Sequence, residues 1–192
     1  MTSPADHAAH PRMPDPAARP DPVTDPHDVF ADVLAANAGY RQRFAASGLV
    51  GLPGRARLGL GVLTCMDSRI DPLGLLGLRP GDAKILRNAG ARVSDDVLRT
   101  LTLATHLLDV QRIMVVAHTR CRMASTTQQA VVEEIAGHGV DATSLDFGLI
   151  SDQLATLRSD VVRIAHWPFL PAGVAVGGFL YDVDTGALDR VV

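Results

Sequence analysis

Hydrophobic residues follow two patterns along this chain: short runs that are apolar throughout, and longer stretches in which apolar residues recur every three to four positions. The short runs are bounded by glycine or polar turns, and their continuous apolar character is typical of strands buried on both faces. We expect strands over residues 57–65, 83–91, 112–118 and 173–183, and a final strand over 187–192 that forms a hairpin with the one before it.

The stretches with helical spacing fall between these runs. They predict helices over residues 27–45, 94–108, 123–137 and 146–165, and one or two helical turns over 71–78. The helix at 94 has the clearest start, because Ser94 can cap it and Asp95 and Asp96 follow where the helix dipole favours negative charge. In the last helix, one side carries the apolar residues Leu149, Leu154, Leu157, Val161 and Ile164.

Strands that alternate with helices indicate an α/β fold: a single domain with a mostly parallel central β-sheet flanked by helices. A chain of 192 residues suits one such domain, which we place at residues 27–192. Residues 1–26 differ, since they hold seven of the twelve prolines and no hydrophobic run. We therefore expect a flexible, proline-rich N-terminal arm, in which His7 and His10 are solvated.

Charge and hydropathy exclude several kinds of partner. The formal net charge is −3 and there is no run of Lys or Arg, so we expect no nucleic-acid partner. No apolar stretch reaches the roughly 18–20 residues of a membrane helix, and the N-terminus lacks the layout of a signal peptide. We therefore expect no membrane association and a cytoplasmic location, where the two cysteines stay reduced. Metal binding or catalysis then explains them better than a disulfide does, with two small buried side chains as the alternative.

Both cysteines follow predicted strands. Cys65 ends the strand at 57–65, and His118 and Cys121 come at the end of the strand at 112–118. Ligands of open α/β sheets bind at the carboxyl ends of the strands, so the three side chains meet if these two strands are neighbours. A Cys₂His set is a zinc set that leaves the fourth coordination position open, as catalytic sites do.

A carboxylate and a guanidinium lie close to the first cysteine. In an extended segment Cys65, Asp67 and Arg69 project to the same side, so Asp67 can lie beside the metal with Arg69 behind it. Arginine binds a carboxylate through two hydrogen bonds and keeps it ionised. Asp67 then either accepts a hydrogen bond from zinc-bound water or takes the fourth position itself.

Three motifs together resemble the β-class carbonic anhydrases: C-x-D-x-R at 65–69, R-N-A-G at 87–90 and H-x-x-C at 118–121. The order of the elements beyond them is similar too, down to the closing GGFLYDVDTGAL. The resemblance implies that Cys65, His118 and Cys121 bind Zn²⁺, that Asp67 alternates between the zinc and its water, and that Arg69 is the partner of Asp67.

The resemblance also implies an activity and an assembly. The activity is the reversible hydration of CO₂ to bicarbonate and a proton by zinc-bound hydroxide. The assembly is a homodimer or higher homo-oligomer, in which a helix within residues 27–47 clasps the neighbouring subunit. His106 is a candidate for carrying the proton to solvent, although a histidine on a helix face is the commoner situation.

The chain departs from the family at one motif. It reads HTRCRM where family members commonly read H-T-D-C-G-M, so that Arg120 replaces an acid and Arg122 replaces a glycine. An arginine there can crowd the pocket, strain the backbone if φ is positive, or simply point to solvent. These arginines suggest, as an alternative, a catalytically impaired zinc-binding relative with a binding or regulatory role. A second alternative is a hydrolase of CS₂ or COS at the same site, which the sequence does not separate from a CO₂ hydratase. A cysteine nucleophile with His118 as base is weaker, because it leaves Cys121 and the Asp67–Arg69 pair without a role.

Overall fold

The computed structural model describes residues 29–192, which fall into two compact units, one up to Gly51 and the other spanning Leu52–Val192. The predicted arm at 1–26, with His7 and His10, lies outside the described residues. Within the described part of the chain, no helix has both the length and the apolar character needed to cross a membrane.

The first unit contains one helix, α1 (Ala31–Phe44), which lies inside the predicted range 27–45. None of its residues is buried. Its exposed apolar side chains include Val33, Leu34 and Tyr40, and the rings of Tyr40 and Phe44 lie 5.6 Å apart. The helix therefore carries more apolar surface than residues 29–51 can cover.

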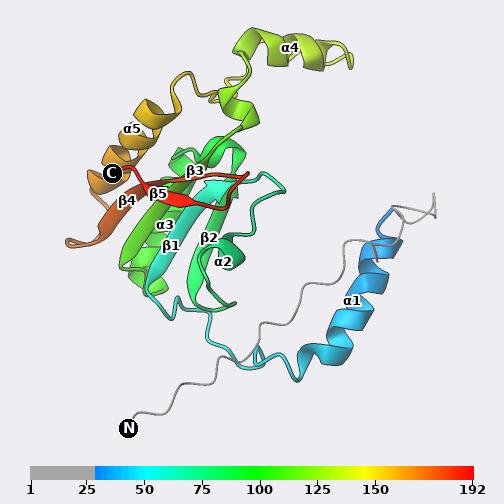
Figure 1. The fold of residues 1–192 in the computed structure, drawn as a ribbon, viewed down its shortest axis with the longest axis vertical. Coiled ribbons are helices and arrows are strands. Elements are labelled where there is room, and N and C mark those ends of the chain that lie inside the picture. The colour runs from blue at the N-terminus through cyan, green and yellow to red at the C-terminus, as the bar shows by residue number, and fades with distance from the viewer. Residues whose placement is uncertain (1–28) are drawn as a thin grey trace. The chain divides into compact units, whose positions relative to one another are not determined.

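The second unit is built on a five-stranded sheet in the order β2-β1-β3-β4-β5 (Figure 1). The strands are β1 (Leu60–Cys65), β2 (Ala83–Asn88), β3 (Arg112–His118), β4 (Ala175–Tyr181) and β5 (Leu188–Arg190). The first four are parallel, and β5 pairs with β4 in the antiparallel direction. The mostly parallel α/β fold and the closing hairpin are confirmed.

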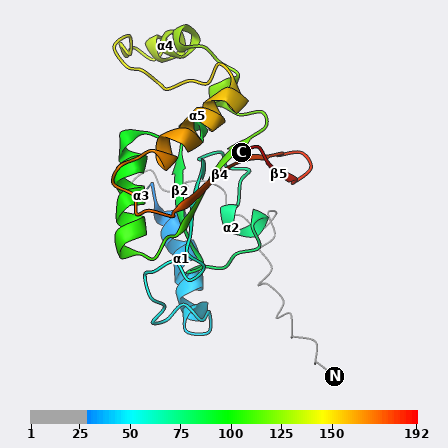
Figure 2. The same cartoon turned by 90° about the vertical axis from the view of Figure 1, so that its left-hand side faces the viewer.

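The two faces of the sheet are covered differently. Helices α3 (Asp95–Leu107) and α5 (Gln153–Ala165) lie on one face and close the main core, whereas the other face carries the short helix α2 (Pro72–Leu75) (Figure 2). On this second face, partly exposed apolar side chains surround a small buried cluster. These side chains are Leu76, Leu78, Ile85, Met114, Phe179, Tyr181 and Leu188.

Two helices begin later in the chain than predicted, because a capping residue sets the start of each. Ser94 caps α3 as expected, accepting a hydrogen bond from the Val97 N–H at 3.3 Å. The helix predicted over 123–137 is instead a short turn at Arg122–Ala124 followed by α4 (Gln128–Ala136), because Thr127 accepts from the Ala130 N–H. The helix predicted from 146 begins at Gln153, because Asp152 accepts from the Ala155 N–H.

The later start of α5 changes part of its predicted apolar side. Leu157, Val161 and Ile164 are buried against the sheet as predicted. Leu149 precedes the helix, so the prediction that it belongs to this helical side is wrong; Leu154 lies in the helix and is 39% exposed. Apolar residues keep a helical spacing before the capping residue, although that part of the chain is not helical.

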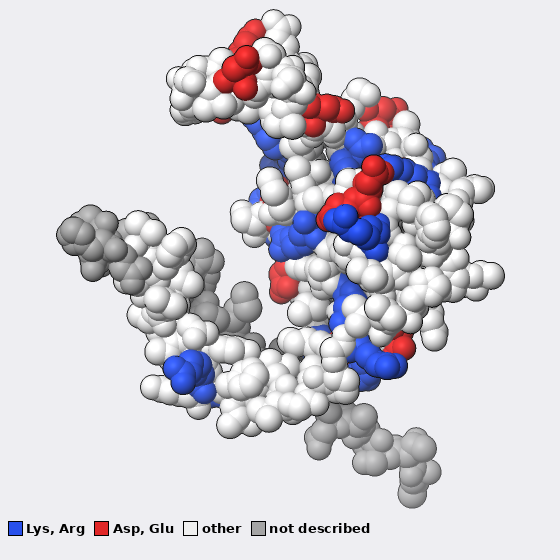
Figure 3. Space-filling view, turned by 180° about the vertical axis from the view of Figure 1, so that it is seen from behind, with Lys and Arg blue, Asp and Glu red and all other residues white. Residues whose placement is uncertain are grey.

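Basic and acidic side chains interleave on the face of the molecule shown in Figure 3. Several described arginines form ion pairs, among them Arg55 with Asp109 and Arg57 with Asp82. Charge is therefore balanced locally, in keeping with the small net charge of the chain.

Candidate metal centre

Strands β1 and β3 are neighbours in the sheet and end at the same edge. Their register pairs Leu63 with Val115 and Thr64 with Val116. Cys65 is the last residue of β1 and His118 the last of β3, and Cys121 follows in the loop after β3. The condition on which the convergence of the three side chains depended is thus met, and all three lie at the carboxyl edge of the sheet.

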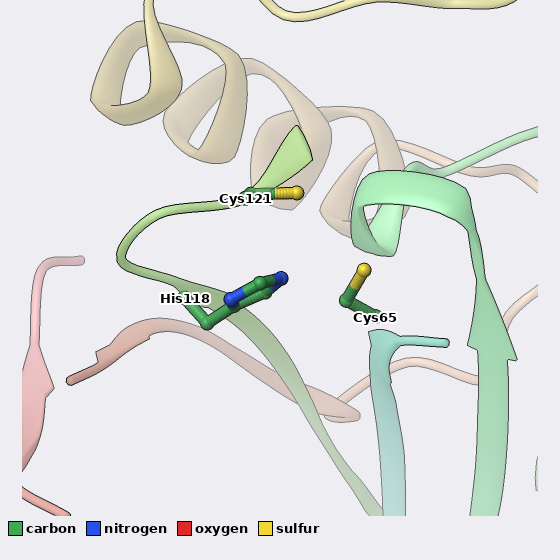
Figure 4. A group of neighbouring side chains, drawn as sticks. All are labelled: Cys65, His118 and Cys121. Atoms are coloured by element: carbon green, nitrogen blue, oxygen red, sulfur yellow. The ribbon is translucent and has the colours of Figure 1, made fainter. Parts of the chain in front are cut away.

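The three side chains point toward one another (Figure 4). The Sγ atoms of Cys65 and Cys121 and a ring nitrogen of His118 all lie within 4.8 Å of one another, and all three residues are buried. Around a tetrahedral ion with bonds of about 2.0–2.3 Å, ligand atoms are about 3.5–3.8 Å apart. A slight closure of the three side chains would therefore suffice to hold such an ion.

The hydrogen bonds of His118 leave one ring nitrogen for a metal. Its Nδ1 lies 2.9 Å from the Thr119 carbonyl oxygen, to which it donates, and this fixes the proton on Nδ1. Nε2 is buried and has no hydrogen-bond partner among the described residues. A buried acceptor without a partner is costly, so the orphaned Nε2 fits a metal ion between it and the two sulfurs.

Without a bound metal, the pKa values of the two cysteines shift in opposite directions. A hydrogen bond from Cys121 lowers the pKa of Cys65 to about 3, helped by His118 and the Gly90 N–H. The pKa of Cys121 is raised, because its thiol hydrogen-bonds to Cys65 and is buried. Burial lowers the pKa of His118, but the neighbouring Cys65 thiolate, the Thr119 carbonyl and the Asp67 carboxylate together outweigh that effect, and the net shift is upward. The metal-free site thus holds one thiolate and one thiol.

Asp67 and Arg69 meet through a turn. The Asp67 carboxylate accepts from the Arg69 backbone N–H at 3.0 Å, from Arg69 Nε at 2.9 Å and from Arg69 Nη2 at 2.8 Å. The Ile70 N–H donates to the Asp67 carbonyl, so the backbone bends here. The prediction of an extended segment through Arg69 is wrong, because the aspartate side chain bonds the backbone two residues on and stabilises a turn.

The Asp67 carboxylate lies beside the three candidate ligands. Its Oδ2 is 3.9 Å from His118 Nε2. The hydrogen bonds from Arg69 hold the pKa of this carboxyl far below its usual range. Asp67 is therefore an ionised acceptor at the edge of the candidate metal site, and its two oxygens are already engaged by Arg69.

Three further residues form hydrogen bonds that hold the site in place. The spacing of residues along the sequence did not predict these hydrogen bonds. Arg87 donates from Nε to the Cys65 carbonyl at 3.0 Å and from Nη2 to the Asp67 carbonyl at 2.7 Å. Gly90 donates its N–H to Cys65 Sγ at 3.3 Å, and Gln153 donates to the His118 carbonyl at 2.8 Å. The R-N-A-G motif was the available signal for the first two; nothing in the sequence pointed to Gln153.

The surroundings of the two cysteines are apolar. Ile70 and Ala91 are buried against them, and Leu75, Met123 and Tyr181 pack at the edge of the same cluster. These side chains form an apolar wall beside the three candidate ligands.

The side chains of Arg120 and Arg122 are exposed and pair with acids outside the three candidate ligands. Arg120 pairs with Asp184, and Arg122 lies 3.6 Å from Glu134; all four side chains are more than half exposed. Arg120 has a φ of 53°, so the left-handed residue of this loop is Arg120, and Arg122 has no positive φ. The Arg122 side chain is 75% exposed, so it faces solvent and does not crowd the pocket.

His106 lies at the other end of the sheet. It is in the last turn of α3, which starts after the carboxyl end of β2 and leads back to the start of β3, a length of about 20 Å. Its Nε2 is 3.0 Å from the Phe169 carbonyl oxygen. A direct proton-carrying role for His106 at the candidate centre is therefore not supported.

Comparisons with known proteins agree with this geometry. A family model described as carbonic anhydrase matches residues 60–147. Beta-carbonic anhydrase 1 of Mycobacterium tuberculosis is 33% identical over 164 residues, which cover 85% of this chain and 98% of the relative. The carbon disulfide hydrolase of an Acidianus strain is 31% identical, covering 77% of this chain and 83% of the relative. The crystal structure of a carbonic anhydrase from Streptococcus mutans superposes with a TM-score of 0.73 at 35% identity, covering 82% of this chain and 97% of that one.

Proposed function

Since the chain belongs to the β-carbonic anhydrase family, we propose that it catalyses the reversible hydration of CO₂ to bicarbonate and a proton, with Zn²⁺ held by Cys65, His118 and Cys121. The observation that carries the proposal is the convergence of these three buried side chains around an orphaned imidazole nitrogen, with an ionised carboxylate 3.9 Å away. Bound zinc would supply Lewis acidity, which lowers the pKa of water at an open fourth position toward neutrality.

Asp67 orients the reacting water in this proposal. Its Oδ2 accepts a hydrogen bond from the water and so directs an oxygen lone pair to the carbon of CO₂. Arg69 keeps Asp67 ionised and holds it by two side-chain hydrogen bonds, which favours the state in which the fourth position is open. If Asp67 left Arg69, its carboxylate would be free to occupy that position instead.

Residues around the candidate ligands keep Cys65 and Asp67 in their relative positions. Arg87 fixes the carbonyls on both sides of Met66, and so sets the distance between Cys65 and Asp67. The apolar side chains around the cysteines accommodate CO₂, which has no net charge and needs no hydrogen-bond donor to enter. The product is an anion, which such walls hold weakly, so its release is favoured.

Stopped-flow CO₂ hydration on zinc-loaded protein between pH 7 and 9 tests the proposal. Cys65→Ser should abolish the rate, and Asp67→Asn should lower it about 100-fold or more, as expected for a lost general-base contact. Asp71→Asn is the matched control, since Asp71 lies in the same loop but caps α2 through the Leu73 N–H. A wild-type rate no higher than that of Cys65→Ser would contradict the proposal.

Hydrolysis of CS₂ or COS is a second candidate for the same site. The 31% identity to a carbon disulfide hydrolase favours it, and both substrates are small, apolar and linear like CO₂. The ligands do not distinguish the three. Release of H₂S from CS₂, measured on the preparation used for CO₂ hydration, decides between them.

A non-catalytic zinc-binding role is the third candidate, suggested by Arg120 and Arg122. The outward orientation of both side chains argues for an open pocket and hence for activity. Arg120→Asp combined with Arg122→Gly restores the motif common in the family. A large gain in activity would support the impaired-relative view, and the absence of a gain would remove its motive.

We also propose that the protein is a homodimer or a higher homo-oligomer. A mostly parallel sheet needs cover on both faces, yet the face that carries α2 leaves Ile85, Met114 and Phe179 partly exposed. Helix α1 has no buried residue and an apolar surface. A second copy, through its own α1 and sheet face, supplies the missing cover.

The chemistry of the site favours a reducing compartment such as the cytoplasm. Both cysteines of the chain are free and both belong to the candidate centre. An oxidising compartment would join or oxidise the thiols that the metal requires. Fractionation followed by immunodetection checks this proposal.

A further inference from the structure

The loop between His118 and Cys121 is tied to the hairpin of β4 and β5. The Thr119 N–H donates to the Tyr181 carbonyl at 2.9 Å, and the Val183 N–H donates to Thr119 Oγ1 at 3.1 Å. The next residue, Arg120, forms an ion pair with Asp184. Three contacts thus join two loop residues to one short stretch of the hairpin.

Arg120 adopts a backbone conformation that its side chain does not favour. Its φ of 53° lies in the left-handed region, where a β-carbon crowds the following carbonyl oxygen. Something in the surroundings must hold the residue there. The ion pair with Asp184 is such a restraint, because Asp184 belongs to a turn fixed by the Asp182 side chain, which accepts from the N–H groups of Asp184 and Thr185.

The carbonyl oxygen of Arg120 completes the hydrogen bonding of Arg69. It accepts from Arg69 Nη2 at 3.2 Å, the same nitrogen that donates to Asp67 Oδ2 at 2.8 Å. The Arg69 guanidinium is therefore held on one side by the Asp67 carboxylate and on the other by the backbone of Arg120. A change at Arg120 reaches Asp67 through this one guanidinium.

We propose that Arg120 is a positioning residue: its ion pair with Asp184 holds the left-handed backbone that presents the Arg120 carbonyl to Arg69, and thereby keeps Asp67 on Arg69 instead of on the metal. The proposal rests on the proposed carbonic anhydrase function. The residue acts through its carbonyl and its distant partner and does not touch the reacting atoms.

A second ion pair, Arg122 with Glu134, lies on the other side of Cys121 and serves as a matched control for the pair of Arg120 with Asp184. Arg122 and Glu134 are 75% and 67% exposed, and Arg120 and Asp184 are 61% and 54% exposed, so both pairs are similarly solvated. The Arg122 carbonyl accepts from Ser125, by its N–H and its hydroxyl, and this contact leads away from Arg69. Breaking this second pair changes the charge next to Cys121 without disturbing the bond to Arg69.

A charge-reversal cycle in the full-length, zinc-loaded protein tests the proposal, using Arg120→Glu, Asp184→Arg and the double variant. The readouts are kcat and KM for CO₂ hydration, and the rate at which the Arg69 Nε–H exchanges with solvent, followed by ¹⁵N NMR. Because an exposed ion pair contributes modestly, each single variant should lower kcat about three- to fivefold with KM unchanged and speed exchange by a similar factor. The double variant should restore both readouts.

The control cycle, with Arg122→Glu, Glu134→Arg and their double variant, should leave both readouts unchanged. Single variants at 120 and 184 that retain wild-type kcat and exchange would overturn the proposal. A double variant that unfolds at the wild-type temperature but stays as impaired as the single variants would overturn it too. If the wild-type protein hydrates no CO₂, the proposed function fails, whereas the exchange rates still decide whether Arg120 holds Arg69.

Discussion

At Gly90 a β-carbon would crowd the wall of the candidate site. Gly90 has a φ of +78°, and a β-carbon added there would lie 3.0 Å from Ile150 Cδ1 and 3.3 Å from Met123 Cβ. Its N–H donates to Cys65 Sγ, so the same residue packs the wall of the site and stabilises the thiolate. Close approach and a left-handed backbone are two separate reasons for glycine at this position.

Gly90→Ala should therefore weaken metal binding as well as stability. Backbone strain alone costs about 1 kcal/mol, and displacement of the Gly90 N–H from Cys65 adds a loss of metal affinity. Thermal unfolding and competition with a chelator measure the two effects. Gly77→Ala is the control, since Gly77 has a φ of +63° with nothing within 4 Å, and it should lose stability but keep metal affinity.

Zinc binding should release a proton from Cys121. The raised pKa of Cys121 means that its thiol is protonated in the metal-free protein at neutral pH, and the thiolate is the form that binds zinc. Affinity should then increase as pH rises. Calorimetry in buffers of different ionisation enthalpy counts the protons released, and Cys121→Ser should release fewer; an equal count would contradict the assignment.

At the scale of elements, the start of β2 depends on one buried carboxylate. Asp82 accepts from the Arg79 N–H at 2.9 Å and from Arg57 Nε at 2.8 Å, and these bonds lower the pKa of Asp82. They hold the turn that leads into β2, the strand that carries Arg87 to the site.

Asp82→Asn should lower the free energy of unfolding by about 1–3 kcal/mol at pH 7. A carboxyl whose pKa is lowered by folding stabilises the protein above the unfolded pKa of about 3.9, and this contribution is lost as pH falls through the folded pKa. The difference between wild type and variant should therefore shrink as pH falls below the unfolded pKa of about 3.9. Denaturant unfolding at several pH values measures it, and Asp109→Asn, in the exposed pair with Arg55, should show a much smaller effect.

Hydrophobic spacing predicted most elements of the fold, and it failed where a side chain overrides it. The continuous runs that became β1 and β3 were correctly placed, because a strand buried on both faces must be apolar throughout. Thr127 and Asp152 start α4 and α5 later than the spacing suggested, because capping is a property of single residues. The turn at Asp67 escaped prediction for the same reason.

The three candidate metal ligands could be predicted from the sequence, whereas the contacts that support them could not. Cys65, His118 and Cys121 could be predicted to lie together, because the two strands that lead to them end at the same edge of the sheet. The supporting contacts of Arg87, Gln153 and Arg120 could not, because they join side chains to carbonyls of segments far away in sequence. Sequence patterns carry no information on which carbonyl faces which guanidinium.

At the scale of the whole molecule, the proposed oligomer depends on α1. Val33→Asp combined with Leu34→Asp should shift the protein to monomers, because both side chains are exposed within the chain and the change costs the monomer little. Sedimentation velocity measures the shift. Leu103→Asp, at a leucine of α3 that is also more than half exposed, should leave the assembly intact. Unchanged sedimentation of the α1 variant would contradict the proposed interface.

The pairing of β1 with β3 also has a consequence during synthesis. Cys65 leaves the ribosome well before His118 and Cys121, and its two fellow ligands join it only after the intervening helix has brought β3 back beside β1. Until then the nascent chain offers zinc a single thiol, which cannot hold the ion against cellular chelators. If the proposed zinc binding holds, loading with metal is therefore a late event that marks the completed crossover, and it stabilises the folded chain by an amount that grows with the logarithm of the free zinc concentration.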